Sequence, residues 1–176
     1  MARDDDACVA EFPDGGEGRL GEAMEQLGPV VEITLGTLPL IASILIHGVG
    51  MYIVQRAFET RGIPLLRTGG HEQLFLAAMI LLMLTTHLAE MLLWAAALVG
   101  IEAVAGFRDA FYYVAGTYTT LGYGEGALPH GWRLLAPMIA ISGLFAFGWT
   151  TGVLFHLVTQ ASLLRTQRGG VSPSQK

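Results

Sequence analysis

Residues 119–125 read Thr-Thr-Leu-Gly-Tyr-Gly-Glu and could coordinate a cation through backbone oxygens. Gly122 and Gly124 can adopt backbone angles that other residues avoid, which lets successive carbonyl groups point the same way. Carbonyl oxygens replace the water shell of a cation without adding net negative charge, so the ion can leave again. Thr120 adds a hydroxyl oxygen, and the hydroxyl of Tyr123 can brace the segment. These residue types are compatible with a cation-binding row of carbonyl oxygens, although the glycines by themselves would also fit a glycine-rich turn.

A short helix is predicted directly before this segment. Residues 107–118 are aromatic and apolar, and Asp109 suits an N-cap or a first helical turn. The stretch is too short to cross a bilayer. Irregular backbone at membrane depth is tolerated only where it is buried in protein or lines a water-filled path. The negative C-terminal end of such a helix would favour a cation beside it.

Three long apolar runs must position these parts, at residues 33–54, 74–101 and 134–164. Each run reaches the roughly 20 helical residues that a bilayer core requires. Hydrophobic residues make up 52% of the chain and charged residues only 14%, against about 25% charged residues in soluble domains. We therefore predict an all-α membrane protein with three transmembrane helices, a re-entrant short helix and an extended loop.

The expected layout has five parts. Residues 1–29 form an acidic tail, disordered or interfacial, and residues 30–56 form the first transmembrane helix. Residues 57–73 form a cytoplasmic connection, residues 74–164 the central unit, and residues 165–176 a cytoplasmic tail. The distribution of Lys and Arg favours an external N-terminus and a cytoplasmic C-terminus. An arrangement with the first run in the membrane interface would place both ends inside.

The run TTLGYGE resembles the selectivity-filter signature of the potassium channel family, TTVGYGD, and the resemblance covers about residues 74–164. It implies a small prokaryotic channel of the two-helix pore type, with an extra N-terminal helix, in the cytoplasmic membrane. One chain carries one loop, so a homotetramer is implied in the lipid bilayer, with K⁺ as the permeant ion and no other cofactor. The resemblance places K⁺ at Thr120, Leu121, Gly122 and Tyr123, completes the filter with Gly124, and assigns filter support to Thr119, Glu125, Tyr112 and Tyr113.

Three positions depart from the family pattern. Leu121 replaces a valine or isoleucine but offers the same carbonyl oxygen, and Glu125 replaces an aspartate with a longer side chain. Gly116 stands where some members have an acid behind the filter. These differences leave a weakly selective cation channel as an alternative to a potassium-selective one.

Glycines in the third run have two interpretations. Gly143 and Gly148 could act as gating hinges, because glycine weakens a helix by about 0.5–1 kcal/mol relative to alanine. Gly148 and Gly152 form a Gly-x-x-x-Gly pattern, which also suits close helix packing. Both interpretations remain open for Gly143.

Ionisable residues within the apolar runs form a second candidate site, at His47, His87 and Glu90. His87, Glu90 and Trp94 share one face of their helix. A charge at the centre of a bilayer costs at least about 2.5–3.5 kcal/mol on insertion scales, so Glu90 is expected to face protein. His47 is its expected partner, and Thr117 and Tyr118 are the other candidates.

Three roles are open for this polar cluster: a hydrogen-bonded lock between helices, a pH sensor, or a metal site. Pairing His47 with His156 could also suggest haem ligation. The alternative from a different functional class is thus a non-conducting membrane protein that binds metal or haem through intramembrane His and Glu.

Other functions find no support in the residues. No basic patch suits nucleic acid, and no catalytic motif indicates an enzyme. Cys8, the only cysteine, excludes an intrachain disulfide. The first run lacks the arginine ladder of a voltage sensor, and no regulatory subunit is identifiable.

Overall fold

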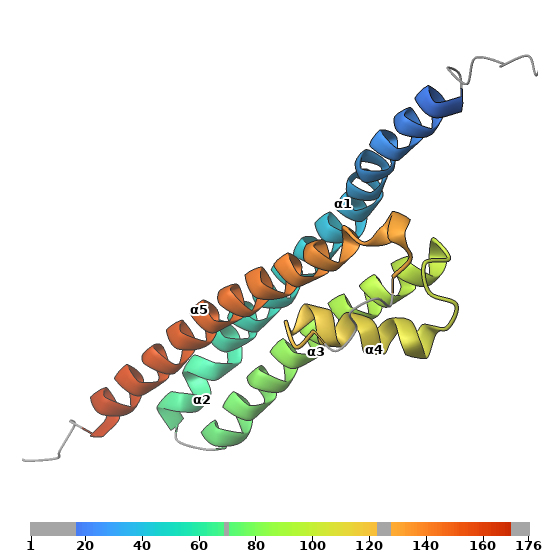
Figure 1. Cartoon of the computed structure of the whole chain (residues 1–176). Helices are drawn as coiled ribbons and strands as arrows, with labels where there is room; N and C mark the ends of the chain where they lie inside the picture. Colours follow the sequence, from blue (N-terminus) through green and yellow to red (C-terminus); the bar gives the residue numbers. More distant parts are fainter. Residues whose placement is uncertain (1–16, 69–70, 123–127, 170–176) are drawn as a thin grey trace, which may run out of the picture.

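The computed structural model describes residues 17–68, 71–122 and 128–169, and every regular element in these ranges is helical (Figure 1). The elements are α1 (Glu17–Ala57), the π-helical turn η1 (Phe58–Gly62), α2 (Ile63–Thr68), α3 (Glu72–Gly100), α4 (Phe107–Tyr118), the 3₁₀ turn η2 (His130–Trp132) and α5 (Leu135–Gly169). The predicted all-α class is confirmed for the described residues.

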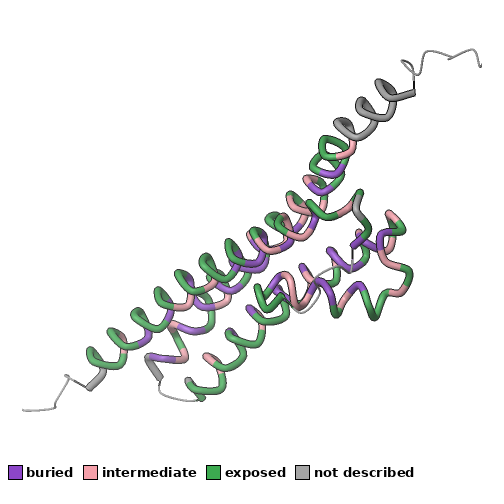
Figure 2. Tube along the Cα trace, viewed as in Figure 1, coloured by how far each residue is buried: buried purple, intermediate pink, exposed green. Residues whose placement is uncertain are grey.

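Three segments are long and apolar enough to cross a membrane: Gly28–Leu66, Gln73–Gly100 and Leu135–Gln167. α1 and α5 run in the same direction, whereas α3 runs in the opposite direction, and α1 packs along both (Figure 1). Figure 2 shows that buried residues line the contacts between helices and exposed residues cover the outside. Large apolar side chains such as Leu45, Leu81 and Phe155 are among the exposed ones. An apolar exterior is expected where lipid surrounds the helices.

The first helix is longer at both ends than the sequence suggested. α1 begins at Glu17, so residues 17–29, expected in a disordered or interfacial tail, continue the helix, while residues 1–16 lie outside the described part. At the other end, η1 and α2 extend the helical chain into the connection expected at residues 57–73.

The predicted short helix is confirmed as α4, with the same bounds, and Asp109 lies in its first turn after Gly106 at the N-cap. α4 packs against α3 and α5 (Figure 1). Its buried side chains, Val114 and Tyr118 among them, join a core cluster with Trp94 of α3 and further side chains of α5. The apolar face of α4 therefore fixes it against two long helices.

Gly143 of α5 lies against the C-terminal end of α4. A Cβ atom at this position would overlap the backbone carbonyl oxygen of Tyr118. A backbone oxygen cannot rotate away as a side chain can, so this contact requires glycine. Gly148 and Gly152 differ, since both are exposed and no described atom lies within 4 Å of a Cβ placed on either. Their Gly-x-x-x-Gly pattern makes no close contact within the described chain.

We expect Gly143→Ala to destabilise the protein by about 1–3 kcal/mol or more, because the added methyl group forces α5 away from α4. The measurement is the midpoint of thermal unfolding of the purified protein in detergent. Gly28→Ala is the control: Gly28 is also helical, but no described atom lies within 4 Å of a Cβ placed on it, so alanine should not lower the midpoint. Equal midpoints for the two variants would contradict the close approach at Gly143.

Candidate functional site

The backbone turns sharply where α4 ends and the filter-like segment begins. The N–H of Leu121 donates to the carbonyl of Gly116 at 2.8 Å, and the N–H of Thr120 donates to that of Thr117 at 3.0 Å. Thr120 itself has a positive φ of 60°. These are the hydrogen bonds and the left-handed residue of a Schellman helix end. The N–H of Gly122 also donates to Gly116, at 3.2 Å.

A threonine at this left-handed position is unusual. Glycine is the usual residue there, and a β-branched residue with positive φ is a backbone outlier. Such strain costs about 1–3 kcal/mol and concentrates at functional sites. Gly122, with φ 75°, adopts a similar angle without that penalty. Sequence reasoning anticipated the unusual backbone angle of Gly122 but not the strained Thr120.

The structure describes some of the predicted filter and filter-support residues and not others. Thr120, Leu121 and Gly122 are exposed on the surface of the single chain. The hydroxyl of Thr119 donates to the carbonyl of Ala115 at 2.7 Å, so it is bonded to its own helix. The remaining predicted residues, Tyr123, Gly124 and Glu125, lie outside the described residues.

The paired aromatics of α4 face different surroundings. Tyr113 is buried in the core cluster that contains Trp94. Tyr112 is 66% exposed. Within the described chain only Tyr113 therefore packs behind the helix, and Tyr112 stays available for contacts outside this chain.

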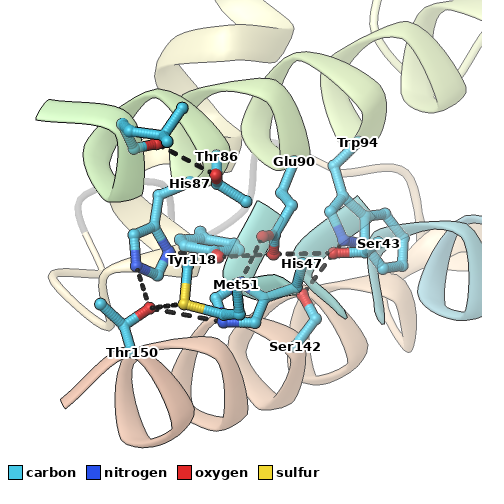
Figure 3. Close-up of polar contacts among 11 residues, drawn as sticks. Ser43, His47, Met51, Thr86, His87, Glu90, Trp94, Tyr118, Ser142 and Thr150 are labelled. Atoms are coloured by element: carbon cyan, nitrogen blue, oxygen red, sulfur yellow. Dashed lines mark hydrogen bonds and ion pairs between the residues drawn. The ribbon is translucent and has the colours of Figure 1, made fainter. Parts of the chain in front are cut away.

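Glu90 occupies the centre of a buried polar cluster (Figure 3). Its Oε1 lies 2.7 Å from Nδ1 of His47, and its Oε2 accepts hydrogen bonds from Ser43 at 3.0 Å and from Tyr118 at 2.8 Å. The side chain is only 1% exposed. The expectation that Glu90 faces protein rather than lipid is confirmed, and so are His47 and Tyr118 as its partners.

His87 extends the cluster to the fifth helix. Its Nδ1 lies 3.0 Å from the Tyr118 hydroxyl, and its Nε2 lies 3.0 Å from the Thr150 hydroxyl. Thr150 also lies 3.4 Å from Nε2 of His47. The cluster thus joins α1, α3, α4 and α5 (Figure 3). Sequence reasoning missed Thr150 and Ser43, although a hydroxyl in an apolar run is a signal that could have marked them.

The Tyr118 hydroxyl is held as a hydrogen-bond donor. Burial raises the pKa of the Tyr118 phenol far above its usual range, and the neighbouring Glu90 carboxylate raises it further. Its proton therefore stays in place and is directed to Glu90.

The same residues bear on the metal and haem interpretations. Ligand atoms of His47, His87 and Glu90 all lie within 4.8 Å of one another, and two imidazoles with a carboxylate is a common zinc ligand set. However, both ring nitrogens of each histidine already have hydrogen-bond partners. His156 is exposed, unlike the buried His47. Hydrogen bonds between helices thus account for the positions of all three side chains.

Two further polar contacts connect the long helices. Glu32 of α1 is buried, and its Oε2 accepts a hydrogen bond from the N–H of Leu134 at 2.8 Å, directly before α5. Trp94 of α3 donates to the hydroxyl of Ser142 of α5 at 3.1 Å. Neither Glu32 nor Ser142 was predicted as a site residue.

Comparison with known families adds an independent observation. Residues 74–160 match a family model described as an ion channel. The match covers just under half of the chain, from α3 through α4 and the filter-like segment into α5. It supports an ion channel family and a multi-pass membrane protein, and it indicates a function other than catalysis. No curated protein and no solved structure matches the chain.

The ion channel segment does not include α1. His47 and Ser43 of α1 therefore reach into the matched segment from outside it, and meet Glu90 there. Any role of this contact in the channel would depend on the first helix.

We expect Tyr118→Phe to lower the free energy of unfolding by about 1–3 kcal/mol, because it leaves Nδ1 of the buried His87 without a partner and removes one of the two donors to Oε2 of Glu90. Tyr112→Phe is the matched control on the same helix, since Tyr112 is exposed. The measurement is denaturation in detergent followed by circular dichroism. A Tyr118→Phe protein as stable as Tyr112→Phe would show that the Tyr118 hydroxyl does not contribute to the lock.

Proposed function

We propose that this chain is the pore subunit of a potassium-selective channel, which conducts K⁺ passively down its electrochemical gradient. The observation that carries the proposal is the position of TTLGYGE: it follows directly from the C-terminal end of α4, inside the segment that matches an ion channel family. Its carbonyl oxygens would form the K⁺ sites at Thr120, Leu121, Gly122 and Tyr123, with Gly124 completing the filter.

The backbone at the start of the segment supports this role. Gly122 has a left-handed φ, a conformation that lets successive carbonyl groups point the same way, as a row of inward carbonyls requires. Thr120 to Gly122 are exposed in the single chain, so their carbonyls can face a shared axis. The C-terminal end of α4 carries the negative end of the helix dipole, which favours a cation near the segment.

Four copies around one axis would complete the site, because one loop cannot surround an ion. In a homotetramer the exposed face of α5 with Gly148 and Gly152 becomes available for packing between subunits. Gly148 would then be the freer of the two hinge candidates, since Gly143 is confined by α4. We place the tetramer in the cytoplasmic membrane, with the C-terminus inside and the N-terminus outside.

We expect Gly122→Ala to abolish potassium flux in liposomes, because alanine does not readily adopt the φ of 75° found here. Gly131→Ala is the control, since Gly131 has nothing within 4 Å of its Cβ position and no positive φ. Undiminished flux in Gly122→Ala would refute the filter assignment. The reversal potential under a potassium/sodium gradient separates a selective pore from a weakly selective one, for which it would lie near zero.

We expect native mass spectrometry of the protein released from detergent to give a particle of four chains. A conducting protein that is uniformly monomeric or dimeric would contradict the tetramer. The same preparation tests the metal and haem alternative, because bound metal or haem would add mass and a visible absorption band.

A further inference from the structure

Five side chains form a closed circuit of hydrogen bonds in the middle of the helix bundle (Figure 3). Starting from Glu90, the circuit passes to His47 at 2.7 Å, to Thr150 at 3.4 Å, to His87 at 3.0 Å, to Tyr118 at 3.0 Å and back to Glu90 at 2.8 Å. We call these five residues the polar ring. Met51 adds a weak sulfur contact to Thr150, and Ser43 donates to Glu90 from outside the ring.

The number of hydrogens in the ring can be counted. Five hydrogen bonds require five hydrogens, one in each. The threonine and tyrosine hydroxyls and two neutral imidazoles supply one each, which makes four, and an ionised carboxylate supplies none. The ring is complete only with one additional proton, carried by the Glu90 carboxyl or by an imidazole. With that proton the five side chains have no net charge, whichever group holds it.

We infer that the polar ring is a proton-dependent positioning device, in which Glu90, His47, Thr150 and His87 hold the C-terminal end of α4 through Tyr118. Tyr118 lies two residues before Thr120, where the filter-like segment starts. Displacement of its hydroxyl would move the backbone that leads into that segment. The effect on conduction rests on the proposed function, whereas the ring and its proton count do not.

Few titratable groups face Glu90 from the elements packed around it. Among the described residues, these groups are His47 from α1, His87 from its own helix and Tyr118 from α4. α5 contributes the uncharged hydroxyl of Thr150. Loss of the additional proton therefore leaves one negative charge and one missing hydrogen, and gain of another proton leaves one positive charge and two donors facing each other.

The proton count gives the sign of the pH dependence. In the unfolded chain the two histidines together bind one proton on average at about pH 6.5, and Glu90 is ionised there. The folded ring also binds one, so its contribution to stability is greatest near pH 6.5. Above that pH the unfolded chain binds fewer protons than the folded one, and stability falls. Below it the unfolded chain binds more, and stability falls again.

Glu90→Gln provides the decisive comparison. The introduced amide brings its own N–H, so the ring closes with two neutral histidines and no additional proton. The ratio of the unfolding constant of the parent to that of Glu90→Gln should therefore rise about tenfold per pH unit above about pH 5.5. The measurement is denaturant titration of the purified full-length protein in detergent between pH 5.5 and 8.5. A ratio that does not change with pH would overturn the inference.

Thr150→Val removes the hydroxyl that joins His47 to His87, and the valine side chain has nearly the same shape as threonine. We expect a lower unfolding midpoint at pH 6.5 than in Thr85→Val, the matched control, because Thr85 is exposed and its hydroxyl bonds to a carbonyl of its own helix. Equal midpoints would also overturn the ring.

Potassium flux of the same proteins distinguishes the ring from the proposed function. The parent should conduct best near pH 6.5, and Glu90→Gln should retain its flux at alkaline pH. If both stability tests support the ring but the protein conducts no potassium, only the proposed function is refuted. If the protein conducts potassium selectively but the ratio of unfolding constants does not change with pH, only the inference about the polar ring is refuted.

Discussion

The buried carboxyl group of Glu90 is the constraint on which the arrangement of the helices depends. A polar group in an apolar interior must find hydrogen-bond partners, since burial without them costs several kcal/mol. Glu90 obtains them from Ser43 and His47 of α1 and from Tyr118 of α4. These partners fix the depth and the rotation of α1 and α4 relative to α3. Apolar contacts alone would let the helices slide along one another, because lipid tails can pack against the same surfaces.

α1 is therefore part of the hydrogen-bonded helix bundle, although it precedes the segment that matches an ion channel family. It contacts that segment through polar groups at two levels. His47 joins the cluster near the middle of the bundle, and Glu32 accepts the N–H of Leu134 at the start of α5. If α1 were held only by apolar packing, lipid could take its place with little loss of stability in the neighbouring helices. Removing α1 would take away two partners of the Glu90 carboxyl group and the acceptor for the N–H of Leu134.

The end of α4 is constrained on both sides of its backbone. Gly143 of α5 lies against the Tyr118 carbonyl, and the Tyr118 hydroxyl is bonded to Glu90. Immediately afterwards the chain enters a left-handed conformation at Thr120 that a threonine adopts only under constraint. The tight packing before this residue supplies that constraint. Rigid support next to strained backbone would suit the row of carbonyl oxygens that we propose for this segment.

Much of this molecule was predictable because helix formation in apolar segments is local. The three apolar runs, the bounds of α4 and the shared face of His87, Glu90 and Trp94 follow from composition and from the period of the helix. The orientation of Glu90 toward protein was also predictable, because a charge exposed to lipid has a high free-energy cost. The start of α1 was missed, because the acidic segment before residue 30 shows no apolar pattern.

Only the tertiary structure decided which groups meet. His47 and Thr150 are 103 positions apart, and Glu32 and Leu134 are 102 apart. No local pattern specifies such pairs, because they depend on the rotation and depth of one helix against another. The sequence by itself determined which residues needed partners, since their polarity and their apolar surroundings are both written in the chain. Packing determined the partners, since these hydrogen bonds form together only when the helices have the rotation and depth found in the structure.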